Sequence, residues 1–196
     1  MDRTTRPLVI VAAFGTSLVV GLVLMLWALG GVRGVTAPAA IGGPFQLTDQ
    51  AGQTVTEKNL QGRPTLVFFG FTHCPDVCPT SLFEISEVLR AMGKDADRVN
   101  AYFISVDPER DTTAAMKDYL SSFDPHLKGL TGAPDAITKV TTEYRVYAKK
   151  VPLKDGDYTM DHTALVYLMD RDGKFIAPFN LKRTPEEAAA DLERYL

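Results

Sequence analysis

The sequence predicts an α/β fold in which a small mixed sheet is flanked by helices, preceded by one N-terminal transmembrane helix. Two observations lead to this prediction. Apolar segments typical of buried strands alternate with segments of helical periodicity, which is typical of an α/β layer fold. A stretch without charge runs from Pro7 to Val32. We therefore divide the chain into an N-terminus with anchor (1–30), a flexible linker (31–43) and a folded domain (44–196).

The apolar segment Leu8 to Leu29 predicts a membrane anchor that contacts the lipid bilayer. As a helix it is about 33 Å long, enough to cross a hydrocarbon core of roughly 30 Å. Arg3 and Arg6 precede it, so the positive-inside rule places the N-terminus in the cytoplasm. Because a mitochondrial type of presequence is absent, we expect a single-pass protein of a bacterial inner membrane, with its C-terminal domain in the periplasm.

A cleaved signal peptide is the alternative, since residues 37–39 resemble a small-residue cleavage site. The apolar segment is longer than the core of about 7–15 residues that signal peptides use. The anchor is therefore the better interpretation.

The composition of the domain argues against a nucleic-acid partner. Beyond residue 40 there are 18 Lys and Arg against 23 Asp and Glu, without a basic cluster. Nucleic-acid binding needs a basic surface. The Gly-, Ala- and Pro-rich residues 30–43 predict a flexible tether.

The first half of the domain predicts a strand, a loop with two cysteines and a helix. Residues 65–71 form an almost continuous apolar run, typical of a central strand buried on both faces. Pro79 suits the first turn of a helix that ends at Gly93. The helical spacing of the apolar side chains supports it: they are Leu82, Ile85, Leu89 and Met92.

The second half continues the alternation. Residues 99–106 predict a second buried strand, followed by a helix capped by Asp111 or Thr112, and residues 134–144 predict a third helix. Two further strands flank a hairpin turn that ends in Gly173. These strands are residues 163–169 and 174–177. A capping box from Thr184 to Glu187, with Pro185 at the first helical position, predicts a last helix that reaches Leu196.

Cys74 and Cys78 are the only cysteines, and they lie four residues apart. In a helical turn this spacing separates their Cα atoms by about 6 Å, which suits a disulfide and also a shared metal ion. A purely structural disulfide is the alternative, but it would close a very short loop and stabilise the domain little. A helix N-terminus is expected to lower the pKa of a thiol there.

The order of strand, cysteine, proline and helix is thioredoxin-like. The spacing is wider, with three residues between the cysteines rather than two.

The three histidines differ as candidate ligands. His126 lies in a polar loop, where an exposed side chain is the simplest interpretation. His73 adjoins Cys74, but adjacent side chains point in different directions, so it is a weak candidate. His162 ends the polar loop 155–161, just before a predicted strand. That position would bring its imidazole to the edge of the sheet that carries the cysteines, but periodicity alone leaves the contact open.

Three separated motifs resemble the Sco/SenC family of copper chaperones. The resemblance runs over about residues 41–196, and the order and spacing of the motifs agree with the family. The motifs are residues 71–79 (FTHCPDVCP), 106–112 (VDPERDT), and 161–163 (DHT) with 167–170 (YLMD).

The resemblance implies a thioredoxin-like domain that binds one copper ion, Cu(I) or Cu(II), through Cys74, Cys78 and His162. It also implies that the protein delivers copper to the dinuclear copper centre of cytochrome c oxidase subunit II, and other periplasmic copper carriers would be further partners. Two thiolates and an imidazole suit copper, whereas zinc usually takes a fourth ligand.

Two enzymatic functions compete with the chaperone. A thiol-disulfide reductase would keep the cysteines of the oxidase subunit reduced, using Cys74 and Cys78 as its catalytic redox pair without His162. The two activities are compatible in one dithiol. A thiol peroxidase is a weaker alternative, because Pro75 stands where such an enzyme has a threonine.

Three further residues near the motifs are candidates for supporting roles. Asp107 and Asp161 either orient the ligands or cap turns and helices. Met160 carries a soft sulfur close to His162, but methionine more often serves packing.

Overall fold

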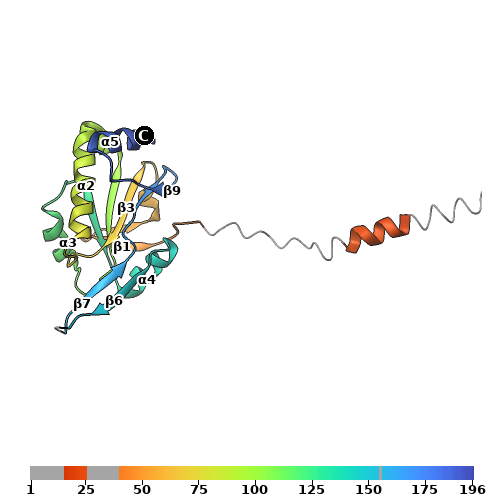
Figure 1. The fold of residues 1–196 in the computed structure, drawn as a ribbon, viewed down its shortest axis with the longest axis horizontal. Helices are drawn as coiled ribbons and strands as arrows, with labels where there is room; N and C mark the ends of the chain where they lie inside the picture. The colour runs from red at the N-terminus through yellow and green to blue at the C-terminus, as the bar shows by residue number, and fades with distance from the viewer. Residues whose placement is uncertain (1–15, 26–39, 155) are drawn as a thin grey trace, which may run out of the picture. The chain divides into compact units, whose positions relative to one another are not determined.

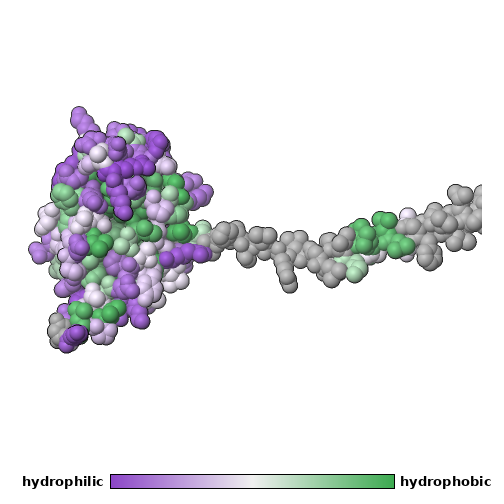
Figure 2. Space-filling view, in the orientation of Figure 1, coloured by the Kyte–Doolittle hydropathy of each residue, from purple (hydrophilic) through white to green (hydrophobic). Residues whose placement is uncertain are grey.

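The computed structural model describes residues 16–25, 40–154 and 156–196. The chain divides into two units, Met1–Ala39 and Ala40–Leu196. In the first unit, residues 16–25 form a helix of mostly apolar side chains (Figure 2). None of the helices within the described ranges has the length and apolar character needed to cross a membrane. The predicted anchor from Leu8 to Leu29 lies largely outside the described residues and stays a prediction.

The second unit is the α/β domain (Figure 1). Its strands are β1 (Gln46–Asp49), β2 (Thr54–Thr56), β3 (Thr65–Gly70), β4 (Asn100–Ser105), β5 (Leu127–Thr131), β6 (Ala148–Pro152), β7 (Tyr158–His162), β8 (Val166–Met169) and β9 (Phe175–Pro178). Its α-helices are α2 (Val77–Met92), α3 (Thr113–Leu120), α4 (Pro134–Glu143) and α5 (Pro185–Glu193), and two 3-10 helices span Glu57–Leu60 and Gly93–Arg98.

The predicted mixed sheet is confirmed. Seven strands lie in the order β2-β1-β5-β4-β3-β8-β9. The central strands β3, β4 and β5 are parallel, while β1 and β8 flank them in antiparallel orientation. Every residue of β3 is buried, as its apolar run predicts. Because β3 and β4 are parallel, Gly70 and Ser105 end at the same edge of the sheet, from which the loop with Cys74 continues.

Helices cover both faces of this sheet. Alternate side chains of β3 point to opposite sides. On one side Phe68 stacks on Phe103, which in turn contacts Tyr119 of α3. On the other side Phe69 packs against Tyr144, the C-cap residue that follows α4.

The helix ends agree closely with the sequence signals. Thr112, rather than Asp111, caps α3, because its Oγ1 accepts a hydrogen bond from the amide of Ala115. The capping box at the start of α5 is confirmed, although the helix ends at Glu193 rather than at Leu196. Helix α2 begins at Val77, earlier than Pro79, so Cys78 already lies in its first turn.

The predicted polar loop 155–161 is wrong for most of its length. Residues Tyr158–His162 form β7, which pairs with β6 in a separate two-stranded sheet. This hairpin is only partly buried, so its strands lack the apolar run that marks a core strand. The strand predicted over 163–169 is correspondingly shorter and begins at Val166.

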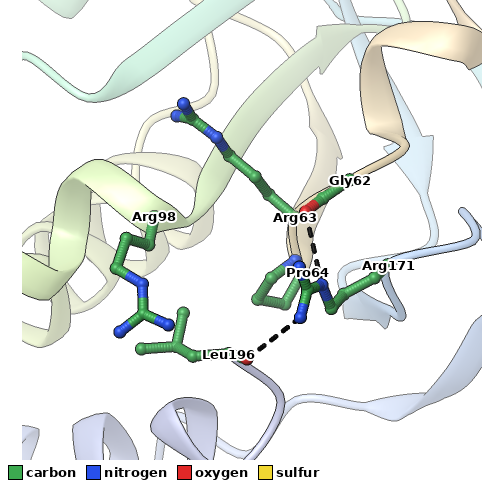
Figure 3. A pocket seen from close by; sticks show the side chains of 6 residues that line it. All are labelled: Gly62, Arg63, Pro64, Arg98, Arg171 and Leu196. Atoms are coloured by element: carbon green, nitrogen blue, oxygen red, sulfur yellow. Dashed lines mark hydrogen bonds between the residues drawn. The ribbon is translucent and has the colours of Figure 1, made fainter.

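A small cavity lies at the end of the sheet away from the cysteines. It measures about 180 Å³ and is lined by residues before β3, before β4 and in the β8–β9 turn (Figure 3). Arg171 crosses it, donating from Nε to the Gly62 carbonyl and from Nη1 to Leu196. None of the candidate ligands Cys74, Cys78 and His162 lines it.

Candidate metal centre

The end of β3 places the two cysteines. Gly70 ends the strand, and the amide of Cys74 donates a hydrogen bond to the carbonyl of Phe71, which turns the chain toward α2. Cys74 is half-buried on the loop and Cys78 is fully buried in the first turn of α2. The Cys78 amide donates to Cys74 Sγ at 3.4 Å. The first turn of the helix therefore holds the sulfur of the loop cysteine.

The β6–β7 hairpin places His162, the last residue of β7. Its Nδ1 lies 3.1 Å from the carbonyl oxygen of Thr163. Only a protonated Nδ1 can donate to this carbonyl, so Nε2 keeps its free lone pair. Nε2 faces Cys78 Sγ at 3.6 Å. The imidazole is thus held in the tautomer and direction that a metal ligand needs.

The three predicted ligands form one group. One ligand atom from each of Cys74, Cys78 and His162 lies within 4.8 Å of the others. Two atoms bound to one ion at about 2.0–2.3 Å lie at most about 4.6 Å apart, so a small movement allows the three atoms to share one ion. In the described ranges this is the one group of three or more His, Cys, Asp and Glu side chains with such geometry. Two sulfurs and an imidazole nitrogen are a donor set that fits copper.

Burial governs the protonation of the inner cysteine. Removal from water raises the pKa of the Cys78 thiol far above its usual value, although a hydrogen bond with the Phe71 backbone opposes the shift. The expectation that the helix N-terminus lowers the pKa is therefore wrong for Cys78, because desolvation is the larger effect. At neutral pH the metal-free Cys78 is a neutral thiol, and its S–H can donate a hydrogen bond to His162 Nε2.

Gly70 is a part of the site that the sequence analysis missed. A Cβ atom at this position would lie 2.7 Å from Cys78 Sγ and 2.7 Å from Phe103 Cε2. Such distances are far below a normal van der Waals contact, so only glycine admits the sulfur against the strand. In the sequence, a glycine at the end of a strand of bulky residues could have indicated that another group approaches the backbone there.

Phe71 is a second missed residue. Its ring meets the imidazole of His162 edge-on, with centroids 5.7 Å apart and an interplanar angle of 89°. Phe71 is itself buried. The contact restricts rotation of the imidazole and keeps Nε2 directed at the cysteines.

The other two histidines lie outside the group. His73 is about half exposed, and its Nδ1 lies 3.0 Å from Thr72 Oγ1. His126 is not freely exposed as expected, since its ring nitrogens lie 2.7 Å from Asp124 and 3.1 Å from Asp97. These carboxylates raise the pKa of His126.

The supporting candidates differ as well. Asp107 is buried and accepts hydrogen bonds from Arg110 Nε at 2.6 Å and Tyr158 Oη at 2.9 Å. Asp161 is exposed on the outer face of the hairpin, opposite Lys149. Met160 is partly buried and packs against the hydrophobic core. Asp107 contacts none of the predicted ligands directly, but through Tyr158 it is hydrogen-bonded to the hairpin that carries His162.

Comparison with solved structures agrees with this geometry. The domain superposes on the structure of Bradyrhizobium japonicum ScoI with copper bound, with a TM-score of 0.79 and 82% identity, over 80% of this chain and 100% of that chain. It also resembles Arabidopsis thaliana ScoI with copper bound, with a TM-score of 0.73 and 40% identity, over 80% of this chain and 98% of that chain.

Curated sequences and family models give the same result. The mitochondrial protein SCO1 homolog 1 of Arabidopsis thaliana is 46% identical over 139 residues. The match spans 70% of this chain but only 42% of that longer relative. The family model SCO1/SenC matches residues 33–196. The chain therefore belongs to the SCO1/SenC family.

Proposed function

We propose that this protein is a copper chaperone that binds one copper ion through Cys74, Cys78 and His162. The observation that supports the proposal is the convergence of these three donor atoms within 4.8 Å at one edge of the sheet. Three protein ligands leave the coordination of copper open, which suits a metal that has to leave again. The relatives ScoI of B. japonicum and of A. thaliana were both solved with copper bound.

The burial of the ligands gives transfer a direction. Cys78 is fully buried, whereas Cys74 and His162 are only partly buried. An incoming thiolate of a recipient therefore meets the copper from the side of Cys74 and His162. In the proposed exchange it replaces Cys74 first, while Cys78 still holds the ion. Transfer then needs no step in which free copper is released.

The recipient in this proposal is the dinuclear copper centre of cytochrome c oxidase subunit II. This is the role that the family resemblance implies, and the open thiolate site is compatible with it. We also propose that the segment Leu8 to Leu29 anchors the protein in a bacterial inner membrane. The domain would then act in the periplasm, where other copper carriers would supply the metal.

A transfer experiment tests the proposed function. The full chain, purified in detergent, is loaded with one equivalent of Cu(I) and mixed with the copper-free soluble domain of an oxidase subunit II. We expect copper to appear in the recipient, followed by the absorption of its dinuclear centre after oxidation. A Cys74→Ser/Cys78→Ser variant serves as the control. The proposal fails if the recipient acquires no more copper from the loaded protein than from this control.

Thiol-disulfide reduction is the second candidate function. Cys74 and Cys78 are both free, and their sulfur atoms lie within 4.8 Å, so formation of a disulfide needs only a small movement. A reductase needs this pair but not the imidazole. Reduction of an oxidised subunit II peptide by wild type and by His162→Ala distinguishes the functions. If His162→Ala keeps full reductase activity but no longer binds copper, then the site carries both functions and only copper binding needs the imidazole.

A further inference from the structure

The loop Asp107–Asp111 contacts both of the segments that carry the proposed copper ligands. We propose that Asp111 and Arg110 are positioning residues: Asp111 holds the cysteine loop and Arg110 holds the β6–β7 hairpin that ends in His162. The inference rests on the proposed function insofar as the held atoms bind copper. The contacts themselves are present in the protein without copper.

Asp111 forms the contacts on the cysteine side. Its carboxylate is fully buried. Oδ1 accepts a hydrogen bond from Thr72 Oγ1 at 2.6 Å, and Oδ2 accepts from the Thr72 amide at 3.1 Å. Oδ2 also accepts from Ser105 Oγ at 2.6 Å. Thr72 lies between Phe71 and the cysteines, so the carboxylate fixes the start of the cysteine loop to the end of β4.

The position of Asp111 is itself fixed. Its carbonyl oxygen accepts a hydrogen bond from Thr131 Oγ1 at the end of β5, at 2.7 Å. Its amide donates to the carbonyl of Asp107 at 2.9 Å. A buried carboxylate is costly unless it is fully hydrogen-bonded, and this one is. The group is therefore rigid enough to position a neighbour.

Arg110 forms the contacts on the histidine side. Its guanidinium lies 3.7 Å from the centroid of the Tyr158 ring. Nη1 donates to the Tyr158 carbonyl at 3.0 Å, and Nε donates to Asp107 Oδ2 at 2.6 Å. Tyr158 Oη closes the arrangement by donating to Asp107 Oδ1 at 2.9 Å. Arginine suits this place because it can stack on a ring and donate several hydrogen bonds at once.

The hairpin depends on such contacts. β6 and β7 form a separate two-stranded sheet, and an isolated two-stranded hairpin is only marginally stable. Tyr158 and His162 lie at the two ends of β7, on the same face of the strand. Arg110 also lies over the ring of Phe71, 5.9 Å from its centroid, and that ring contacts His162. Met160 and Ala148 of the hairpin also pack against the core. Loss of Arg110 therefore loosens the hairpin, and with it the imidazole, without detaching the hairpin from the domain.

The test compares copper affinities in a double-mutant cycle. Cu(I) affinity is measured by competition with a chromogenic chelator for wild type, Arg110→Met, His162→Ala and the double variant. We expect Arg110→Met to weaken binding about tenfold, as loss of a residue that supports a ligand typically does. In the His162→Ala background the same change should cost less than about twofold, because its effect acts through the imidazole. If Arg110→Met weakens copper binding by the same factor in the His162→Ala background as in wild type, the inference for Arg110 is overturned.

Two further variants separate the two sides of the site. Thr72→Val removes one hydrogen-bond donor to Asp111. We expect it to lower the Cu(I) affinity several-fold, and by the same factor in the His162→Ala background. Lys149→Met removes a positive charge from the outer face of the same hairpin and should leave the affinity within about twofold. If Thr72→Val keeps wild-type affinity, or Lys149→Met weakens binding as much as Arg110→Met, the assignment of roles is wrong.

Hydrogen exchange of the metal-free protein provides a readout that does not depend on copper. Arg110→Met should speed exchange of the β7 amides at least tenfold and leave the β3 amides unchanged. Tyr158→Phe, which removes only the hydroxyl, should give a smaller change in the same direction. Unchanged β7 exchange in both variants would overturn the inference. Equal copper binding by wild type and His162→Ala would instead reject the proposed ligand set, and exchange would still decide whether Arg110 holds the hairpin.

Discussion

Replacing Gly70 by alanine is a direct test of how the sheet positions the buried sulfur. The added Cβ would lie 2.7 Å from both Cys78 Sγ and Phe103 Cε2, whereas ordinary van der Waals contact begins at 3.4 Å. Both partners, or the strand itself, therefore have to move by about 0.7 Å. Both partners are fully buried, so neither can turn into solvent.

The expected cost follows from this crowding. Inserting a methyl group into a packed core typically costs about 1–3 kcal/mol. Alanine also restricts the unfolded chain, which stabilises the folded protein by about 0.4–1 kcal/mol. We therefore expect the free energy of unfolding to fall by about 1–2 kcal/mol. Because Cys78 Sγ is one of the atoms that must move, we also expect the copper affinity to fall about tenfold, the lower end of the usual effect of a supporting residue.

Gly129→Ala is the matched control. Gly129 lies in the buried strand β5, and an added Cβ would lie 2.7 Å from Leu120 Cδ1 and from Met116 Cε. It should also lower stability, but it contacts no proposed ligand and should keep wild-type copper affinity. Urea denaturation of the metal-free protein and chelator competition for Cu(I) measure the two quantities. If Gly70→Ala loses stability as the control does but binds copper like wild type, our reasoning about Gly70 is refuted.

Three further predictions concern the thiol, the ring beside His162 and a helix cap. Burial raises the pKa of the Cys78 thiol, so this group must lose a proton when copper binds. The apparent Cu(I) affinity should therefore rise by at least about tenfold per pH unit between pH 6 and 8, since Cys78 alone releases one proton and Cys74 also binds as a thiolate. Chelator competition that shows no pH dependence would contradict this. Phe71→Leu removes the edge contact with His162. It should lower copper affinity a few-fold and shift the imidazole NMR signals of the metal-free protein, and unchanged signals would show that the ring does not hold the imidazole. Thr184→Ala removes the capping box of α5. It should lower the free energy of unfolding by about 1 kcal/mol in urea without affecting copper binding, and equal stability would show that the cap contributes nothing.

The elements that the sequence predicted well are those whose signal is local. Buried strands such as β3 and β4 show as unbroken apolar runs, and helix starts show as residue types such as Pro185 after Thr184. The cysteine pair was equally readable, because its spacing within one turn fixes its geometry. These features need no information from distant parts of the chain.

The elements that the sequence did not reveal depend on tertiary contacts. β6 and β7 are largely polar, partly buried strands without a continuous apolar run, and residues distant in the sequence, such as Arg110, contact them. The approach of His162 to Cys78 spans 84 residues, so no local pattern could have established it. The raised pKa of Cys78 likewise results from burial beneath neighbouring elements, which outweighs the local effect of the helix N-terminus.

The measurement that tests the central claim most directly is Cu(I) binding by the reduced full chain and by His162→Ala. The imidazole Nε2 lies 3.6 Å from Cys78 Sγ, and one ring nitrogen of His162 lies within 4.8 Å of both sulfur atoms, so the three residues are expected to share one ion. Chelator competition should show one copper per chain for wild type. The affinity of the variant should be lower by more than the roughly tenfold to hundredfold that loss of a merely supporting residue causes. Equal affinity of wild type and His162→Ala would contradict the three-ligand copper site.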